Sequence, residues 1–148
     1  MSNFNLKETI DSGVDLAIQE DLGSGDLTSS LIPEETIGQG AILSRVDCVL
    51  SGSAWANATF QKLDPSITLD WQYKDGDRVT AGDILCKLQG PARALLTGER
   101  TALNFLQTLS AVATKTRLYV DAIAHTNATI LDTRKTLPGL RKALKYAV

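Results

Sequence analysis

The sequence has 148 residues, of which 43% are hydrophobic and 22% charged, and its formal net charge is −2. These values are typical of a folded soluble domain, and the length excludes a complete (β/α)₈ barrel of about 250 residues. No segment approaches the ~18 uninterrupted apolar residues of a membrane span. The N-terminus also lacks the basic start and apolar core of a signal peptide. We therefore expect a cytoplasmic protein without a membrane partner.

The two cysteines, Cys48 and Cys86, indicate neither a disulfide framework nor a metal site. Two are too few for such a framework, and with a single His125 and no Cys-x-x-Cys spacing they make no zinc motif. We expect both to be reduced, buried core residues.

The charges are unevenly distributed along the chain. Residues 1–40 contain eight acidic residues and one base, whereas residues 133–148 contain five bases and no acid: Arg134, Lys135, Arg141, Lys142 and Lys145. The basic end implies an anionic partner. Because the total charge is near neutral, we expect a small anion rather than a nucleic acid.

The N-terminal residues predict an amphipathic helix followed by a loop. Asn5 and Glu8 have the spacing of a capping box. Apolar residues then recur at helical intervals: Leu6, Ile10, Val14, Ala17 and Ile18. Residues 20–28 are rich in glycine and acids, and we interpret Asp21 and Asp26 as turn or capping residues rather than metal ligands.

Residues 40–90 predict an antiparallel sheet with a helix. A strand is expected over 40–50, with four apolar side chains on one face: Ile42, Val46, Cys48 and Leu50. Residues 53–63 predict a helix, and alternating apolar residues predict strands over 67–73 and 84–88. Between these two strands, residues 75–85 share a D-G-x-x-V-x-x-G-D-x-L pattern with lipoyl- and biotinyl-type carrier domains. The nearby Lys74 and Lys87 are not at a hairpin tip, so we interpret the hairpin as a fold element.

Residues 91–126 predict one long helix or two in series, because they contain no proline after Pro91 and have apolar residues at helical spacing. A second stripe begins at Arg100 and is partly polar: Arg100, Asn104, Gln107 and Ala111. Such a face needs a partner. By residue type alone, Arg100 could simply pair with an acid such as Glu99 or Asp121.

The last 21 residues predict a strand over 128–132 and a helix that starts near Thr136 and Pro138. One strand and one helix cannot bury a parallel sheet, so we expect a truncated second domain.

The residues Asp132-Thr-Arg-Lys-Thr lie between that strand and helix, where parallel sheets place their ligands. Arg134 can bind a carboxylate or phosphate through two parallel N–H bonds, and Lys135 adds a mobile charge. A solvated basic loop explains the same residue types. We assign no catalytic role to His125, nor to Ser24, Ser30 and Ser110, which lack the context of a nucleophile.

Three segments together resemble the quinolinate phosphoribosyltransferase family, also called nicotinate-nucleotide pyrophosphorylase (carboxylating): residues 20–28, 98–107 and 132–141. The resemblance spans nearly the whole chain but only about the first half of a typical member. It implies an α+β N-terminal domain over residues 1–110, an open antiparallel sheet with helices. Residues 111–148 would then be the first βα portion of an incomplete, truncated α/β barrel.

The resemblance also implies a glycosyltransferase of de novo NAD synthesis. Quinolinate and phosphoribosyl pyrophosphate give nicotinate mononucleotide, pyrophosphate and carbon dioxide, with Mg²⁺ whose ligands are expected beyond residue 148. Thr133, Arg134 and Lys135 match the substrate-binding stretch of the family. Arg100 matches an arginine that reaches the active site of the neighbouring subunit in a homodimer or larger oligomer. No certain catalytic residue falls in this half, and we expect the 148-residue chain alone to be inactive.

Two alternatives remain open at this point. A related protein, such as a molybdenum-associated pyrophosphorylase-like protein, would share the fold and act on another substrate. A non-enzymatic carrier or interaction module is suggested by the hairpin pattern.

Overall fold

The computed structural model describes residues 5–23 and 31–148, so Ser24, Asp26 and Ser30 lie outside the described residues. The elements in chain order are α1 (Leu6–Leu22), β1 (Ile37–Leu43), β2 (Cys48–Val49), α2 (Ser53–Leu63), β3 (Thr68–Trp71), β4 (Arg78–Val79), β5 (Ile84–Pro91), α3 (Ala92–Ile123) and α4 (Arg141–Ala147). Within these residues, no helix is both long and apolar enough to cross a membrane.

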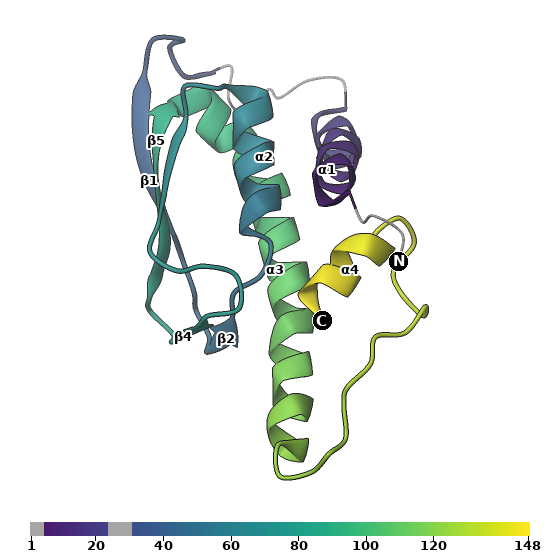
Figure 1. Cartoon of the computed structure of the whole chain (residues 1–148). Helices are drawn as coiled ribbons and strands as arrows, with labels where there is room; N and C mark the ends of the chain where they lie inside the picture. The colour runs from purple at the N-terminus through teal and green to yellow at the C-terminus, as the bar shows by residue number, and fades with distance from the viewer. Residues whose placement is uncertain (1–4, 24–30) are drawn as a thin grey trace.

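The strands form an open antiparallel sheet, as expected for an α+β domain. Its order is β1-β5-β3, with Ile42 opposite Cys86 and Leu69 opposite Leu88, and a short β2-β4 pair lies beside it. Figure 1 shows α2 and α3 between this sheet and a second group of helices, α1 and α4. The predicted sheet with helices is therefore confirmed.

Two apolar clusters fill the two interfaces of this arrangement. The first lies between the sheet and α2 and α3, with Leu50, Phe60, Ile67, Cys86, Leu88 and Leu106 among its buried members. The second joins α1 and α4 to α2 and α3 through Ile10, Val14, Trp55, Phe105, Leu109, Ala143, Leu144 and Ala147. Both α2 and α3 contribute to the two clusters, and α3 is the central element because it also contacts α1, α4 and the strands β1, β2 and β5.

A glycine permits the close contact between α2 and α3. A Cβ atom on Gly98 would lie 2.8 Å from Leu63 Cδ1 and 2.9 Å from Phe60 Cδ1. These distances are shorter than real contacts, so only glycine fits without displacing the phenyl ring. This explains a residue of poor helix propensity inside a long helix.

Several local predictions agree with the structure. Asn5 caps α1, because its side chain accepts a hydrogen bond from the Glu8 backbone N–H at 3.2 Å. Residues 53–63 form α2 with the predicted bounds, and residues 92–123 form one helix rather than two. That helix continues through residue 110, the expected boundary between two domains, and the division stays a prediction.

The single strand predicted over residues 40–50 instead forms two strands, β1 and β2, separated by residues 44–47. The chain leaves β1 after Leu43, and Val46, expected on the buried face, is 64% exposed. In the turn that separates β1 from β2, the Ser44 hydroxyl donates to the Val46 carbonyl at 2.6 Å. Cys86 is fully buried, which raises the pKa of its thiol to about 11, whereas Cys48 is only partly buried.

The strand predicted over residues 128–132 is not formed, and residues 124–140 contain no helix or strand. No described strand lies beside this segment, so its backbone has no ladder to join, and apolar content alone does not make a strand.

The final helix begins at Arg141 rather than near Pro138. Gly139 has φ of +80°, a left-handed conformation that an α-helix excludes.

Candidate functional site: an exposed basic segment

The residues Thr133, Arg134 and Lys135 lie exposed on the irregular segment between α3 and α4. The Asp132 carboxylate accepts from the Thr133 N–H at 2.7 Å, and the Thr133 hydroxyl accepts from the Lys135 N–H at 3.2 Å. These local bonds shape the turn through its backbone. They leave the charged ends of Arg134 and Lys135 outside the network.

All five bases of residues 133–148 are unpaired among the described residues, since none takes part in a described ion pair. Helix α4 places its apolar residues in the second cluster and its charged residues outward. Five positive charges therefore lie close together in sequence without a neutralising acid. This arrangement can bind a polyanion.

Tyr146 fixes α4 to the rest of the protein. Its hydroxyl donates to Asp75 Oδ2 at 2.8 Å, and its ring lies 5.3 Å from that of Trp55. Burial and this hydrogen bond raise the pKa of Tyr146 to about 12. The same Asp75 carboxylate accepts from the backbone N–H groups of Gly52 and Ser53 at 2.9 and 3.1 Å.

Asp75 is therefore a cap supplied from a distant turn to the N-terminus of α2, whose own N-cap, Gly52, has no side chain. Sequence reasoning missed this pair, because Asp75 and Tyr146 are 71 positions apart. The only local signal was a helix that starts without an N-cap side chain.

The hairpin that resembles carrier domains has an internal structural role. Asp77 accepts from the Lys74 N–H at 2.9 Å, and Asp83 accepts from Tyr73 and from the Thr80 N–H at 2.9 and 2.8 Å. Asp77 and Asp83 thus close turns rather than present a lysine. Lys87 lies within β5.

Arg100 has a different partner from the two acids considered above. It pairs with Asp21 in the last turn of α1, at 2.8 Å between Arg100 Nε and Asp21 Oδ1. Asp121 instead pairs with Arg78 and Arg117, at 2.5 and 2.7 Å. The stripe of Arg100, Asn104, Gln107 and Ala111 is exposed, as a face that needs a partner would be.

A cleft of about 530 Å³ lies between α1, α3 and the turn before α4. Asp21, Thr101 and Asn104 line it on one side, and residues 138–140 line it on another. Its lining includes neither Arg100 nor residues 133–135. The structure therefore brings the end of α1 to α3 but does not bring Arg100 and the basic segment into this one cleft.

The described residues offer no metal centre, since no three His, Cys, Asp or Glu side chains among them are grouped to hold an ion. The expected Mg²⁺ therefore has no ligand set among the described residues. Anion binding is what the described side chains can do.

Comparisons with known proteins show a consistent relationship. The family model for the quinolinate phosphoribosyl transferase N-terminal domain matches residues 26–110, and that for the C-terminal domain matches residues 112–148. A probable nicotinate-nucleotide pyrophosphorylase (carboxylating) of Bacillus subtilis is 43% identical over 129 residues, 87% of this chain and 45% of the relative. Quinolinate phosphoribosyltransferase (decarboxylating) 1b of Nicotiana tabacum is 42% identical over 91% of this chain and 39% of its own length.

Solved structures agree with these relatives. The nicotinate-nucleotide pyrophosphorylase of Francisella tularensis superposes with a TM-score of 0.93 at 36% identity, over 98% of this chain and 51% of that one. The chain thus spans less than half the length of these two curated relatives and about half of this solved one. From its sequence and its fold, the chain belongs to the quinolinate phosphoribosyl transferase family.

Proposed function

We propose that this chain is part of an enzyme that transfers a phosphoribosyl group from phosphoribosyl pyrophosphate to quinolinate. The transfer would release pyrophosphate, and decarboxylation would then give nicotinate mononucleotide and carbon dioxide in de novo NAD synthesis. The observation that carries the proposal is the set of five bases at residues 133–148 that form no ion pair with any described residue, in a chain whose relatives are named for this reaction. Both substrates are polyanions, which matches this charge.

Arg134 would bind carboxylates of quinolinate, and Lys135 would face the phosphoribosyl substrate. The reaction joins a ring nitrogen to the anomeric carbon while pyrophosphate leaves. Two anions must therefore be held in line against their mutual repulsion. Fixed cations supply both the orientation and the compensation of developing negative charge. The planar guanidinium suits a carboxylate, whereas the Lys135 ammonium suits a phosphate oxygen as a point charge.

Arg100 would act in the active site of a second copy of the chain, within a homodimer or larger oligomer. Its side chain is 69% exposed, and it shares no described cleft with the basic segment. The exposed stripe that it begins on α3 is a surface that a partner subunit could cover. A site shared between subunits fits these observations better than a site within one.

Residues 111–148 would begin an incomplete α/β barrel, with residues 1–110 as the N-terminal domain. Residues 128–132 would become a strand once a neighbouring parallel strand pairs with them. The Mg²⁺ ligands would come from sequence that follows this region in the family.

Substitution of Arg134 tests the function in the complete polypeptide that includes this chain. Arg134→Ala is expected to lower kcat/KM for quinolinate by ~100-fold or more, the effect of losing a bidentate charged contact. Arg134→Lys should recover only part of the loss. The matched control is Arg45→Ala, an exposed arginine on the β1–β2 loop. Near wild-type kinetics for Arg134→Ala would contradict the proposal.

Product identification separates the proposed reaction from its alternative. Nicotinate mononucleotide released from quinolinate supports the proposed function, and turnover of another acceptor instead supports a related pyrophosphorylase-like protein. The purified 148-residue chain is expected to give no product. Detectable turnover by a sample of verified mass would contradict that expectation.

A further inference from the structure

The ion pair between α1 and α3 joins two residues in very different surroundings. Arg100 is 69% exposed at its side chain, whereas Asp21 is 20% exposed. Asp21 also lines the cleft between α1, α3 and residues 138–140. A mostly buried carboxylate thus holds an arginine whose other atoms face solvent.

Asp21 occupies a position that disfavours a carboxylate. It lies in the last turn of α1, beside Glu20, and that turn contains no base. The C-terminal end of a helix carries partial negative charge, so an acid there is repelled. Asp21 Oδ2 is moreover buried and accepts no hydrogen bond within the described residues. A buried acceptor without a donor is unfavourable.

Stability does not account for this placement. An ion pair with a largely solvated arginine contributes little to folding, because water screens the attraction. The arrangement therefore breaks two local rules for a small structural gain. Such conflicts between local preference and structure gather at functional sites.

The geometry of the pair leaves Arg100 able to bind a second anion. The contact with Asp21 runs through Nε, and no other acid among the described residues pairs with this guanidinium. Fixing Nε restricts the rotation of the guanidinium plane. The exposed terminal nitrogens can then meet a carboxylate in a pre-set orientation, which lowers the entropy cost of binding.

We propose that Asp21 is a positioning residue, which orients Arg100 toward a carboxylate of the substrate. This inference rests on the proposed function, in which Arg100 completes the quinolinate site of a neighbouring subunit. Asp21 touches no substrate itself and acts through Arg100 alone.

The chain offers a matched control on the same helix. Asp15 also pairs across to another helix, with Lys62 Nζ at 2.6 Å from its Oδ1, and has no contact with Arg100. Asp21→Asn and Asp15→Asn make the same chemical change in two ion pairs from α1. A merely structural effect would appear in both.

The kinetic experiment uses the complete polypeptide. Asp21→Asn is expected to raise KM for quinolinate about tenfold with kcat nearly unchanged, because a ground-state orientation is lost. KM for phosphoribosyl pyrophosphate should stay the same, as should both constants in Asp15→Asn. Asp21→Glu should recover part of the affinity. In an Arg100→Ala background, Asp21→Asn should have no further effect, because the two residues act as one unit.

A second readout needs no activity. In the ¹⁵N–¹H spectrum of the 148-residue chain, the Arg100 Nε–Hε proton should exchange slowly with water, and Asp21→Asn should make that exchange fast. The Asp15→Asn spectrum should retain the slow signal. Fast exchange in the unmodified chain would overturn the proposal, even if a variant proved too unstable for kinetics.

The kinetic outcomes distinguish a failure of the role proposed for Arg100 from a failure of the positioning role proposed for Asp21. If Arg100→Ala leaves kcat/KM for quinolinate unchanged, the proposed role of Arg100 fails, and the role of Asp21 fails with it. If Arg100→Ala is impaired but Asp21→Asn matches Asp15→Asn, only the positioning role is overturned. An equal loss from Asp21→Asn in both backgrounds would also overturn it, because Asp21 would then act elsewhere.

Discussion

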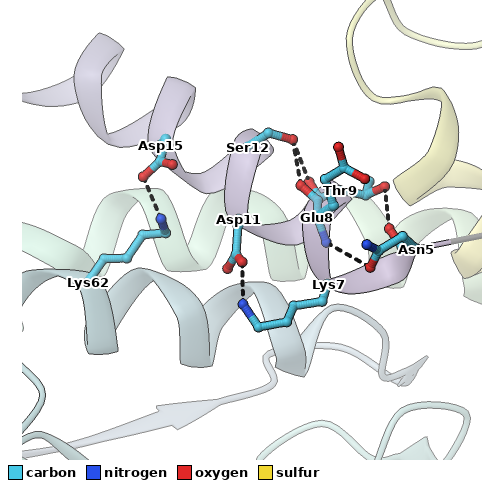
Figure 2. A network of polar contacts seen from close by, with 8 residues as sticks. All are labelled: Asn5, Lys7, Glu8, Thr9, Asp11, Ser12, Asp15 and Lys62. Atoms are coloured by element: carbon cyan, nitrogen blue, oxygen red, sulfur yellow. Dashed lines mark hydrogen bonds and ion pairs between the residues drawn. The ribbon is translucent and has the colours of Figure 1, made fainter.

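Helix α1 and the basic segment 133–148 carry opposite charges, and they differ in where those charges find partners. Three of the five acids of α1 are paired within the chain: Asp11 with Lys7 at 2.5 Å, Asp15 with Lys62 at 2.6 Å and Asp21 with Arg100 at 2.8 Å. Figure 2 shows the first two pairs with the Asn5 cap. The five bases of the basic segment take part in no ion pair among the described residues.

This difference indicates that charge serves two purposes in one small protein. Two of the three pairs join α1 to α2 or α3, whereas the bases at the other end take part in no ion pair among the described residues, and we propose that they bind a ligand. Helix α4 docks through apolar residues and the neutral Tyr146 hydroxyl, so its position does not depend on its positive charges. The net charge of −2 by itself indicates neither use of charge.

The strongest way to break the docking of the basic segment is to remove Asp75. Asp75→Ala is expected to lower the free energy of unfolding by about 2–3 kcal/mol, because α2 loses its cap and Tyr146 loses its acceptor. Urea unfolding measures the change. The control is Asp77→Ala in the same turn, where one exposed N–H loses its acceptor. Equal losses for the two variants would contradict the account of α4.

Tyr146 predicts a pH dependence of the same docking. Its pKa is about 12 in the folded protein against an ordinary value of 10.0, so the folded state binds the phenolic proton more tightly than the unfolded state. Its contribution to stability is present below pH 10 and is lost as the pH rises from about 10 to about 12.

Comparison with Tyr146→Phe isolates this contribution, since the lysines that titrate in the same range are common to both proteins. The difference in unfolding free energy should shrink across that window. Tyr73→Phe is the comparison: the pKa of the partly buried Tyr73 is also raised, chiefly through its bond to Asp83, so its difference should change in the same direction. A constant difference for Tyr146→Phe would show that the hydroxyl contributes nothing.

An added polyanion should supply the partner that the basic segment lacks. At phosphate or quinolinate concentrations ten times the dissociation constant, the free energy of unfolding should rise by ~1.4 kcal/mol. Sodium chloride at matched ionic strength should have little effect. The double variant Arg134→Gln with Lys135→Gln should lose the response, whereas Arg45→Gln with Lys74→Gln should keep it. An equal response in both double variants would indicate general charge screening.

The sequence predicted those elements whose signals are local. The Asn5 cap, the bounds of α2 and the alternation of Leu69 and Trp71 all depend on residues near one another in the chain. The prediction of a strand at residues 128–132 was wrong because a strand forms only beside another strand that pairs with its backbone. The burial predicted for Val46 was wrong because this residue lies in a turn, where the Ser44 hydroxyl bonds to its carbonyl.

In the candidate site, too, the local features were predicted from the sequence and the contacts between distant residues were not. The type and spacing of residues identified the exposed bases Arg134 and Lys135, and neither forms an ion pair with a described residue. The partner of Arg100 could not be predicted, because Asp21 approaches it only after α1 packs on α3. The roles of these residues in binding stay predictions, since they follow from the resemblance and from charge rather than from a bound substrate.

The smallest expected effect sharpens the comparison at α1. Asp15→Asn removes the pair with Lys62, in which the two side chains are 64% and 31% exposed, and should cost only about 0.5 kcal/mol or less. The loss should be smaller still in 1 M salt, where the distance over which charges attract each other falls to about 3 Å. A cost above about 1 kcal/mol, unaffected by salt, would place this pair outside the range of surface ion pairs. A small cost instead means that α1 is held by Ile10 and Val14 in the second apolar cluster. Its acids would then be free to serve function, as we infer for Asp21.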